Sequence, residues 1–276
     1  GWLSSHREEL DALVFDIDGV LLVKGSSAPG SRELLAMLRN EEIPFYLLTN
    51  DGDHSTREKS DILNASGIDV HPEEIVSCAD GLVELFQENK PSLAPFFIMG
   101  NLGSPCFAEK AGLSTTRNLD QIDQCQGIIV GEKGYDWEPT INAAVNFFVK
   151  NPQAPLIVPN PDEYYPGNAG QLCIGAGGVG RFISHVLESY GIKVVPFYLG
   201  KPFAPIFKKT HALLEQRYGR QIARDRVLMT GDFIKSDVQG ALNFGYRSAL
   251  VLTGVTTAAM VEKSDVQPDL IFQALG

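Results

Sequence analysis

Short apolar runs alternate with helical patterns along this chain, and that alternation constrains the fold more than any other feature of the sequence. An apolar run at residues 12–15 precedes leucines at helical spacing within residues 34–38, and a second apolar run follows at residues 44–48. A strand, a helix and a strand at these intervals form a βαβ unit, in which a right-handed crossover joins two parallel strands. The sequence therefore predicts an α/β fold with a parallel sheet.

The C-terminal third repeats the same order of elements. Helical patterns and apolar runs alternate there: a helix at 205–218, a strand at 226–230, a helix that ends at Gly245 and a strand at 248–252. These segments are predicted to resume the sheet that the N-terminal third begins.

The middle of the chain supplies the elements of a second domain. It contains short buried-strand candidates and two helical patterns: strands at 96–100, 127–131 and 155–159, and helices around 140–150 and 181–190. A chain of 276 residues is long enough for two modest domains. We predict a core formed by residues 1–80 and 196–276, into which an α/β domain at 81–195 is inserted.

The charge balance argues against partners that carry many negative charges. Lysine and arginine number 23 against 34 aspartates and glutamates, which gives a formal net charge of −11. Nucleic acid and anionic membranes are bound through clustered basic side chains, so neither is expected as a partner. No run approaches the roughly 18 apolar residues of a membrane helix. We expect a cytoplasmic protein, although a first residue of Gly1 rather than Met leaves an upstream organelle-targeting segment open.

The cysteines indicate neither a metal site nor a disulfide scaffold. Their spacing fits no zinc motif and no Cys-x-x-Cys pair. They are predicted to be free thiols: Cys78, Cys106, Cys125 and Cys173.

Two carboxylates directly follow the first predicted strand. Asp16 and Asp18 lie two residues apart, so in extended chain both side chains point the same way, and Gly19 permits a tight turn. Ligands of open α/β sheets bind beyond the carboxyl ends of the strands, where these acids lie. The alternative is a solvated strand end with a turn-forming Asp-Gly pair.

Small hydrogen-bonding side chains end the second predicted strand. Thr49 and Asn50 supply uncharged donors, and the backbone N–H groups of Asp51 and Gly52 can add more. This combination suits a phosphate oxygen. By itself, however, the pattern favours a turn with a local cap.

The C-terminal third holds a lysine and two further carboxylates. Lys201 lies beside Gly200, where a solvated surface lysine is the ordinary interpretation. Asp232 follows the predicted strand at 226–230, and Asp237 lies five positions later at a helix start. Helix capping is an alternative for Asp237 and less so for Asp232.

Taken in order, these four segments resemble the haloacid-dehalogenase-like (HAD) superfamily of phosphotransferases. Its pattern is Asp-x-Asp-Gly after the first strand, a Thr or Ser ending the second, a Lys, and Gly-Asp-x-x-x-x-Asp. All four motifs are present, at residues 16–19, Thr49, Lys201 and residues 231–237.

The long interval between Thr49 and Lys201 resembles that of members with a large α/β cap between the second and third motifs. Within it, residues 160–162 and 175–178 are similar to segments of the NagD-like and p-nitrophenylphosphatase-like subclass. The resemblance implies a Rossmann-like parallel-sheet HAD core with an inserted α/β cap domain.

The resemblance also implies a phosphatase that works through an aspartyl-phosphate. Asp16 matches the nucleophile, and Asp18 matches the general acid/base that protonates the leaving oxygen and then activates water. Thr49 matches the phosphate-binding hydroxyl, with Asn50 beside it. Lys201 matches the lysine that neutralises charge on the nucleophile and the phosphoryl group.

Mg²⁺ is the cofactor that the resemblance implies. Asp232 matches the carboxylate that holds it together with Asp16 and the backbone carbonyl of Asp18, while Asp237 matches a supporting residue. Several carboxylates would repel a phosphate dianion, so a divalent cation and a lysine are needed to make the site attractive. Oxygen ligands favour magnesium over zinc.

The implied substrate is a small phosphorylated metabolite, selected by the cap. Asn160 and Asp162 are the candidate substrate residues there. The sequence does not distinguish sugar phosphates, nucleotides, pyridoxal phosphate and phosphoglycolate. Caps of this subclass often contribute to dimer contacts, so a homodimer is open.

The second motif departs from the family pattern. Relatives often continue it with a neutral run, whereas here Asn50 is followed by Asp51, Gly52 and Asp53. An inward Asp51 would oppose phosphate, so we expect it to point outward. The departure weakens the assignment of Asn50 and Gly52 as phosphate neighbours.

Residues 175–180 satisfy Gly-x-Gly-x-x-Gly, the pattern of dinucleotide-binding loops. Such loops also have an acidic residue about twenty positions later, and residues 193–200 contain none. These glycines are predicted instead to lead into a helix that begins near Arg181.

Three other functions belong to different classes. A phosphomutase would use the same core and stays open. A non-catalytic phospho-accepting or binding module is disfavoured, because both Asp16 and Asp18 are present. A dehalogenase usually lacks the second aspartate and needs no metal. The leading expectation is therefore a phosphoric monoester hydrolase.

Overall fold

The chain divides into two compact units in the computed structural model, which describes residues 2–88, 93–167 and 171–276. Unit 1 consists of Gly1–Thr49, Thr56–Val76 and Lys201–Gly276, and unit 2 consists of Asn50–Ser55 and Ser77–Gly200. The divisions fall after Val76 and after Gly200, close to the predicted residues 80 and 195. The sequence did not predict that Asn50–Ser55 would group with unit 2.

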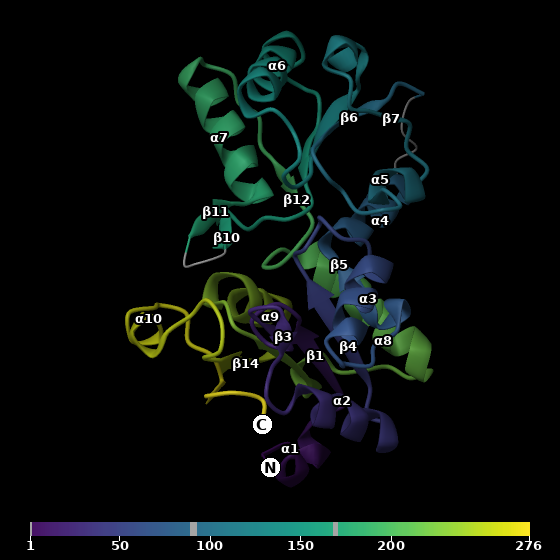
Figure 1. Cartoon of the computed structure of the whole chain (residues 1–276), viewed down its shortest axis with the longest axis vertical. Coiled ribbons are helices and arrows are strands. Elements are labelled where there is room, and N and C mark those ends of the chain that lie inside the picture. The colour runs from purple at the N-terminus through teal and green to yellow at the C-terminus, as the bar shows by residue number, and fades with distance from the viewer. Residues whose placement is uncertain (1, 89–92, 168–170) are drawn as a thin grey trace. The chain divides into compact units, whose positions relative to one another are not determined.

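Unit 1 is built on a six-stranded sheet in the order β15-β14-β13-β1-β4-β5. Figure 1 labels β14, β1, β4 and β5 of this sheet. Its strands are β1 (Ala12–Asp16), β4 (Phe45–Thr49), β5 (Ile75–Ser77), β13 (Val227–Gly231), β14 (Arg247–Val251) and β15 (Leu270–Phe272). Each pairing among β15, β14, β13, β1 and β4 is parallel. A short antiparallel hairpin of β2 (Leu22–Val23) and β3 (Ser26–Ser27) follows β1. The α/β prediction is confirmed.

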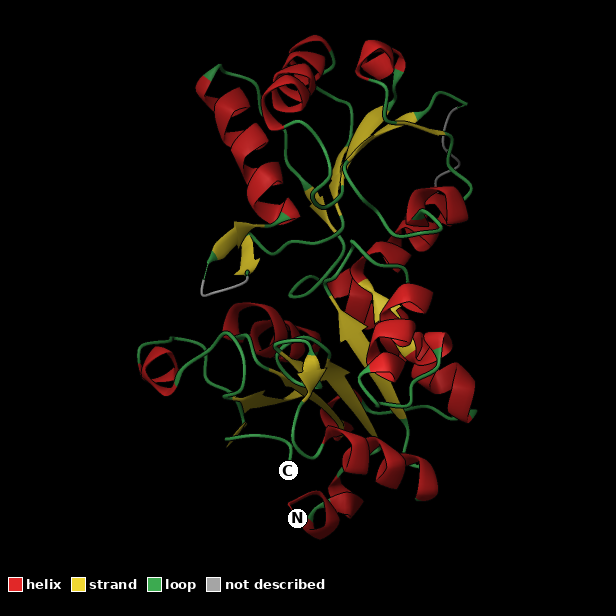
Figure 2. Ribbon diagram, in the orientation of Figure 1, coloured by secondary structure: helices red, strands yellow, loops and turns green. Residues whose placement is uncertain are grey.

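Helices flank the strands of unit 1 (Figure 2). Because side chains alternate along a strand, Leu13 and Phe15 of β1 face one side of the sheet. They share a buried cluster with leucines of α2 (Ser31–Asn40) and α3 (Thr56–Ala65). On the other side, α8 (Ala204–Tyr218) contacts β4, where the guanidinium of Arg217 lies 5.8 Å from the Tyr46 ring centroid. The remaining helical segments are α1 (Trp2–Ser5), η1 (Arg7–Glu9), η2 (Pro72–Glu74), η6 (Arg224–Arg226), the π-helical turn η7 (Ile234–Val238), α9 (Gln239–Phe244) and α10 (Ala258–Glu262).

Unit 2 contains its own parallel sheet, in the order β12-β9-β8-β6-β7. Its strands are β6 (Phe96–Met99), β7 (Thr115–Thr116), β8 (Gly127–Val130), β9 (Leu156–Val158) and β12 (Phe197–Tyr198), and β10 (Tyr164–Pro166) and β11 (Leu172–Ile174) form a separate hairpin. Its helices are η3 (Cys78–Asp80), α4 (Gly81–Glu88), α5 (Phe107–Lys110), η4 (Leu119–Gln124), α6 (Trp137–Lys150) and α7 (Ala176–Ser189). Phe147 of α6 and Ile183 of α7 are fully buried in one apolar cluster with Ile128 of β8.

The glycine-rich segment lies inside α7 rather than before it. The helix begins at Ala176, five residues earlier than the predicted start near Arg181. A Cβ on Gly177 would collide with the carbonyl of Pro161, and one on Gly180 would press against the Val158 side chain. The glycines therefore let the first turns of the helix approach neighbouring backbone and strand closely. The predicted helix start near Arg181 was wrong because this tertiary contact outweighs the low helix propensity of glycine.

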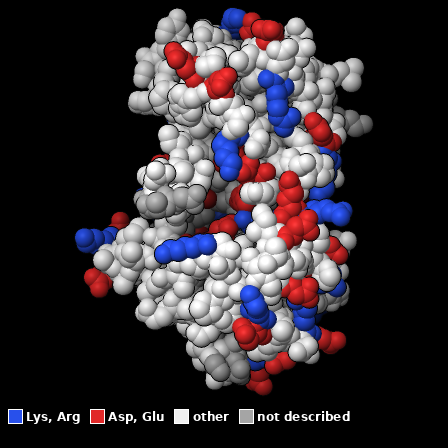
Figure 3. Space-filling view, in the orientation of Figure 1, with Lys and Arg blue, Asp and Glu red and all other residues white. Residues whose placement is uncertain are grey.

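The expectations drawn from composition concern thiols, membrane spans and surface charge. All four cysteines are free, as predicted. Within the described parts of the chain, no helix combines the length and apolar character needed to cross a membrane. On the face shown in Figure 3, lysine and arginine side chains lie interspersed with acidic ones.

Candidate active site

Three central strands of unit 1 end at one edge of the sheet. β1 ends at Asp16, β4 ends at Thr49, and β13 ends one residue before Asp232. β1 lies between β13 and β4, and Asp16 is in register with Leu48. Parallel strands present their carboxyl ends at the same edge, so the predicted Asp16, Thr49 and Asp232 lie there together.

Lys201 joins two of the predicted carboxylates. Its Nζ lies 2.7 Å from Oδ1 of Asp16 and 2.7 Å from Oδ1 of Asp237, and it also donates to the Leu48 carbonyl at 3.5 Å. The residue is 1% exposed, so the surface-lysine alternative is wrong. Burial by itself would lower the pKa of Lys201, but the two carboxylates raise it above its ordinary value. The ammonium group therefore stays charged.

The buried carboxylates of this edge carry more negative charge than Lys201 offsets. Burial raises the pKa of Asp16 well above its ordinary value, against the attraction of Lys201 and with the help of Asp237 and Asp232. Burial, followed by repulsion from Asp237, raises the pKa of Asp232 to about 7. Additional positive charge near Asp16 and Asp232 would therefore stabilise the ionised forms of these carboxyls.

Asp237 organises the turn after β13. Its Oδ2 accepts the backbone N–H groups of Asp232 at 3.1 Å and Phe233 at 3.0 Å, while its Oδ1 pairs with Lys201. It therefore bonds to the residues before it rather than capping the helix after it. The side chain of Asp232 in turn accepts the N–H of Val255 at 2.6 Å.

The three carboxylates can hold a cation together. Asp16, Asp232 and Asp237 each offer one oxygen, and these oxygens lie within 4.8 Å of one another. A buried set of carboxylate oxygens fits Mg²⁺, which prefers oxygen ligands, and the pKa values of Asp16 and Asp232 in this set are raised. The resemblance implied Asp16, Asp232 and the backbone carbonyl of Asp18 as ligands, and the cluster of side-chain oxygens contains Asp237 beside Asp16 and Asp232.

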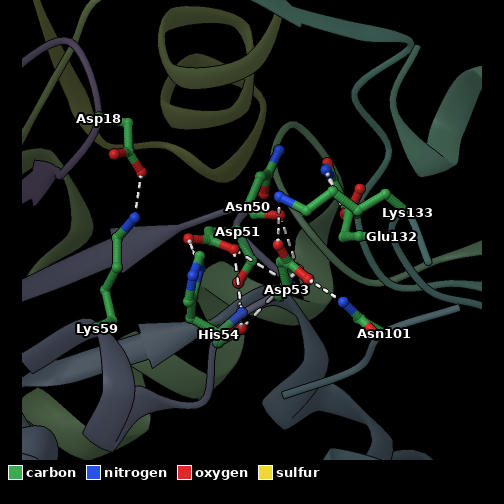
Figure 4. A network of polar contacts seen from close by, with 12 residues as sticks. Asp18, Asn50, Asp51, Asp53, His54, Lys59, Asn101, Glu132 and Lys133 are labelled. Carbon is green, nitrogen blue, oxygen red and sulfur yellow. Dashed lines mark hydrogen bonds and ion pairs between the residues drawn. The ribbon is translucent and has the colours of Figure 1, made fainter. Parts of the chain in front are cut away.

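The Asp18 side chain turns to a lysine that sequence reasoning missed. Its Oδ2 lies 2.6 Å from Nζ of Lys59 in α3, as Figure 4 shows. The Lys59 side chain is 5% exposed and the Asp18 side chain is 59% exposed. A signal was present, because Lys59 lies four positions before Leu63 on the buried face of a helix.

The other predicted residues, Asn50, Asn160 and Asp162, belong to unit 2. Asn160 donates from Nδ2 to Oε1 of Glu132 at 2.9 Å and accepts the N–H of Asp162 at 2.9 Å. The carbonyl of Asn50 accepts from the Cys78 thiol at 3.2 Å. The boundary between the units falls between Thr49 and Asn50, which separates the two predicted phosphate-binding residues by unit.

The loop Asn50–Ser55 is bound to unit 2 through Asp53 (Figure 4). One oxygen of Asp53 lies 2.9 Å from Nζ of Lys133, and the other accepts from Nδ2 of Asn101 at 3.0 Å. These contacts explain why a loop that follows a core strand groups with the inserted unit.

Asp51 was expected to point outward, and it turns back onto its own loop instead. Its Oδ1 accepts the N–H groups of Asp53 at 2.9 Å and His54 at 3.2 Å, and its Oδ2 lies 2.9 Å from Nδ1 of His54. Its side chain is only 16% exposed. Local backbone donors hold a short acidic side chain more readily than open solvent does at such a turn.

Glu132 is a half-buried residue in an acidic part of unit 2. Burial raises its pKa to about 7, the hydrogen bond from Asn160 opposes this, and Asp51, Asp53 and Asp162 add to it. The folded state therefore binds a proton more tightly than the unfolded chain does. The stabilisation is complete below the ordinary pKa near 4.5 and is lost as the pH rises through about 7.

Glu132→Gln is predicted to remove this pH dependence. Glutamine keeps an acceptor for Asn160 without the charge, so the free energy of unfolding should rise relative to the wild type by about 1 to 3 kcal/mol at pH 8 and much less at pH 5. Urea unfolding at both pH values measures the difference. Glu138→Gln, at an exposed position, is the matched control. A variant-to-wild-type difference that is the same at both pH values would contradict the assignment.

Two family models match the sequence. The model described as haloacid dehalogenase-like hydrolase matches residues 13–114, and one described as HAD-hydrolase-like matches residues 198–276. Together they span about two thirds of the chain.

Individual proteins match over nearly the whole length. An acid sugar phosphatase of Staphylococcus saprophyticus is 27% identical over 266 residues, which is 96% of this chain and 95% of the relative. The structure of NagD from E. coli K-12 has a TM-score of 0.78 at 22% identity and covers 96% of this chain and 97% of that one. The structure of a glycerol phosphate phosphatase from Mycobacterium tuberculosis, in complex with magnesium, has a TM-score of 0.79 at 22% identity and covers 97% of this chain and 76% of that one.

These matches agree with the motifs, with the parallel sheet of unit 1 and with the α/β insertion. The chain therefore belongs to the haloacid-dehalogenase-like hydrolases, and its fold is that of the NagD-like members.

Proposed function

We propose that this chain is a magnesium-dependent phosphatase that hydrolyses a small phosphorylated metabolite through an aspartyl-phosphate on Asp16. The observation that carries the proposal is the buried contact of Lys201 with Asp16 and Asp237, beside Asp232, at the ligand-binding edge of a parallel sheet. The chain is a phosphoric monoester hydrolase of the HAD type, since HAD family models match it and a relative that covers 96% of its length is named acid sugar phosphatase.

In the first step, a carboxylate oxygen of Asp16 attacks phosphorus and the bond to the leaving oxygen breaks. Asp18 donates a proton to that oxygen, so the leaving group departs as an alcohol. The charged ammonium of Lys201, 2.7 Å from Asp16, offsets the charge that gathers on the phosphoryl group. The hydroxyl of Thr49, at the end of the neighbouring strand, is the proposed donor to a phosphate oxygen.

In the second step, water attacks the phosphorus of the aspartyl-phosphate and the bond to Asp16 breaks. Asp18, now deprotonated, takes a proton from that water. The products are inorganic phosphate and the original Asp16 carboxylate, so the protein returns to its starting state.

Asp16, Asp232 and the backbone carbonyl of Asp18 are the proposed protein ligands of Mg²⁺, with Asp237 in a supporting contact with Lys201. When bound, Mg²⁺ supplies positive charge that lets a phosphate dianion approach several carboxylates. The raised pKa values of Asp16 and Asp232 support this assignment, because a bound divalent cation would stabilise the ionised forms of both carboxyls. A fold neighbour in complex with magnesium supports it as well.

A phosphorylated sugar or polyol is the proposed substrate class. It rests on the relatives named acid sugar phosphatase and glycerol phosphate phosphatase. Asn160 and Asp162 of unit 2 remain the proposed substrate-selecting residues. Hydrogen-bonding side chains of this kind suit the hydroxyl groups of such a substrate.

Asp16→Asn is predicted to abolish turnover and leave the fold intact. The amide is a poor nucleophile, so hydrolysis of p-nitrophenyl phosphate should fall by at least about a thousandfold. Released p-nitrophenolate measures the rate, and circular dichroism measures the fold. Asp123→Asn, at a side chain that is 55% exposed, is the matched control and should keep full activity. Retained hydrolysis by a folded Asp16→Asn variant would reject the nucleophile.

Removal of divalent cations is predicted to stop turnover. Without added positive charge, the carboxylates of Asp16, Asp232 and Asp237 repel the phosphate dianion. Activity on p-nitrophenyl phosphate should be lost in a chelator and return when Mg²⁺ is added in excess. Turnover that resists the chelator after extensive dialysis would refute the metal assignment.

A further inference from the structure

A buried lysine contacts the proposed general acid/base. Lys59 is the fourth residue of α3, and its Nζ lies 2.6 Å from Oδ2 of Asp18 (Figure 4). Both residues belong to unit 1. Among the described residues, Lys201 forms ion pairs with Asp16 and Asp237, whereas the ion pair of Asp18 is with Lys59.

A lysine is an unfavourable choice at this position for packing alone. Its side chain is 5% exposed, and burying an ammonium group costs several kcal/mol unless an opposite charge compensates. It also lies in the first turn of a helix, where the helix dipole disfavours a cation. Leu63, one turn further along the same helix face, packs in the apolar core. An apolar residue at position 59 would therefore serve packing better, and the charge points to a role at Asp18.

The contact restricts a side chain that is otherwise open to solvent. Asp18 is 59% exposed, and its loop contains the tight turn at Gly19 with a φ of 90°. Lys59 engages Oδ2, while Oδ1 makes no hydrogen bond or ion pair with any residue that the structure describes. The ion pair therefore selects one orientation of the carboxyl group and leaves one oxygen for proton transfer.

We propose that Lys59 is a positioning residue that holds Asp18 in the orientation needed for general acid/base catalysis. This inference rests on the proposed function, since Asp18 must move a proton in both chemical steps. Small errors in placing a catalytic group cost large factors in rate, which makes the orientation of Asp18 a target for such a contact. Lys59 itself touches neither the substrate nor the reacting atoms in this account.

Asp18 acts as an acid in the first step and as a base in the second, and substrates that differ in their need for the acid can test the two roles separately. p-Nitrophenolate leaves without a proton, whereas an alkoxide needs one. Hydrolysis of the aspartyl-phosphate needs Asp18 as a base for either substrate. Loss of the contact should therefore slow the release of an alcohol in the first step and slow the second step throughout.

The experiment compares Lys59→Met with Lys59→Arg, on glycerol phosphate and on p-nitrophenyl phosphate with Mg²⁺. Lys59→Met should lower kcat on glycerol phosphate by about 10- to 100-fold, with KM within about twofold. On p-nitrophenyl phosphate, stopped-flow should show a fast first release of about one p-nitrophenolate per chain, followed by slow turnover. Lys59→Arg keeps the charge and should recover most of the wild-type kcat.

Two controls separate positioning from a general loss of structure. Lys150→Met removes an ion pair of the same 2.6 Å length, with Asp123, in which both side chains are more than half exposed. It should leave kcat unchanged. In an Asp18→Asn background, Lys59→Met should have no further effect on kcat, because the lysine acts through Asp18. Lys59→Gln provides a second neutral variant if Lys59→Met does not fold.

Three results would overturn the positioning role. The first is an unchanged kcat in a folded neutral variant of Lys59, and the second is a change confined to KM. The third is an equal loss of kcat on both substrates without a fast first release of p-nitrophenolate. Absence of turnover by the wild type on both substrates would instead reject the proposed function, and the positioning role with it. The wild-type measurement therefore distinguishes the two failures.

Discussion

The central constraint in this molecule is the crowding of carboxylates at one edge of the unit 1 sheet. Asp16, Asp232 and Asp237 bring oxygens within 4.8 Å of one another in a buried setting. Like charges at such distances disfavour the ionised forms of the carboxyls unless positive charge lies among them. Lys201 provides one such charge, at 2.7 Å from both Asp16 and Asp237. This crowding of carboxylates suits the proposed function, in which Asp16 and Asp232 bind a cation and Asp16 accepts a phosphoryl group.

The fold explains why these residues meet although they are far apart in the sequence. Parallel strands end at the same edge, so Asp16 of β1 and Asp232 after β13 become neighbours. The tight turn after β13 depends on Asp237, which accepts two backbone N–H groups while it pairs with Lys201. Structural support and charge balance are therefore performed by the same side chain. Lys59 extends this arrangement of charge to Asp18.

The sequence predicts the strands and motifs well, because both are local patterns. The strand predicted at 12–15 is β1 (Ala12–Asp16), and the α/β class follows from the same periodicity. Long-range contacts were not predictable in this way. The helix α7 begins within its glycine run because neighbouring backbone approaches closely. The loop Asn50–Ser55 groups with unit 2 because Asp53 contacts Lys133. A charged residue such as Lys59 is usually solvated, so its spacing of four positions before Leu63 does not by itself predict its burial.

The most direct measurement of the central claim is the identity of the residue that carries the phosphoryl group. Rapid quenching during turnover, followed by borohydride reduction, converts an aspartyl-phosphate to homoserine and leaves free carboxylates unchanged. Peptide mass spectrometry then locates the modified position. The account predicts homoserine at position 16, in amounts that depend on substrate and Mg²⁺. Modification at another residue, or none in a chain that turns over substrate, would contradict it.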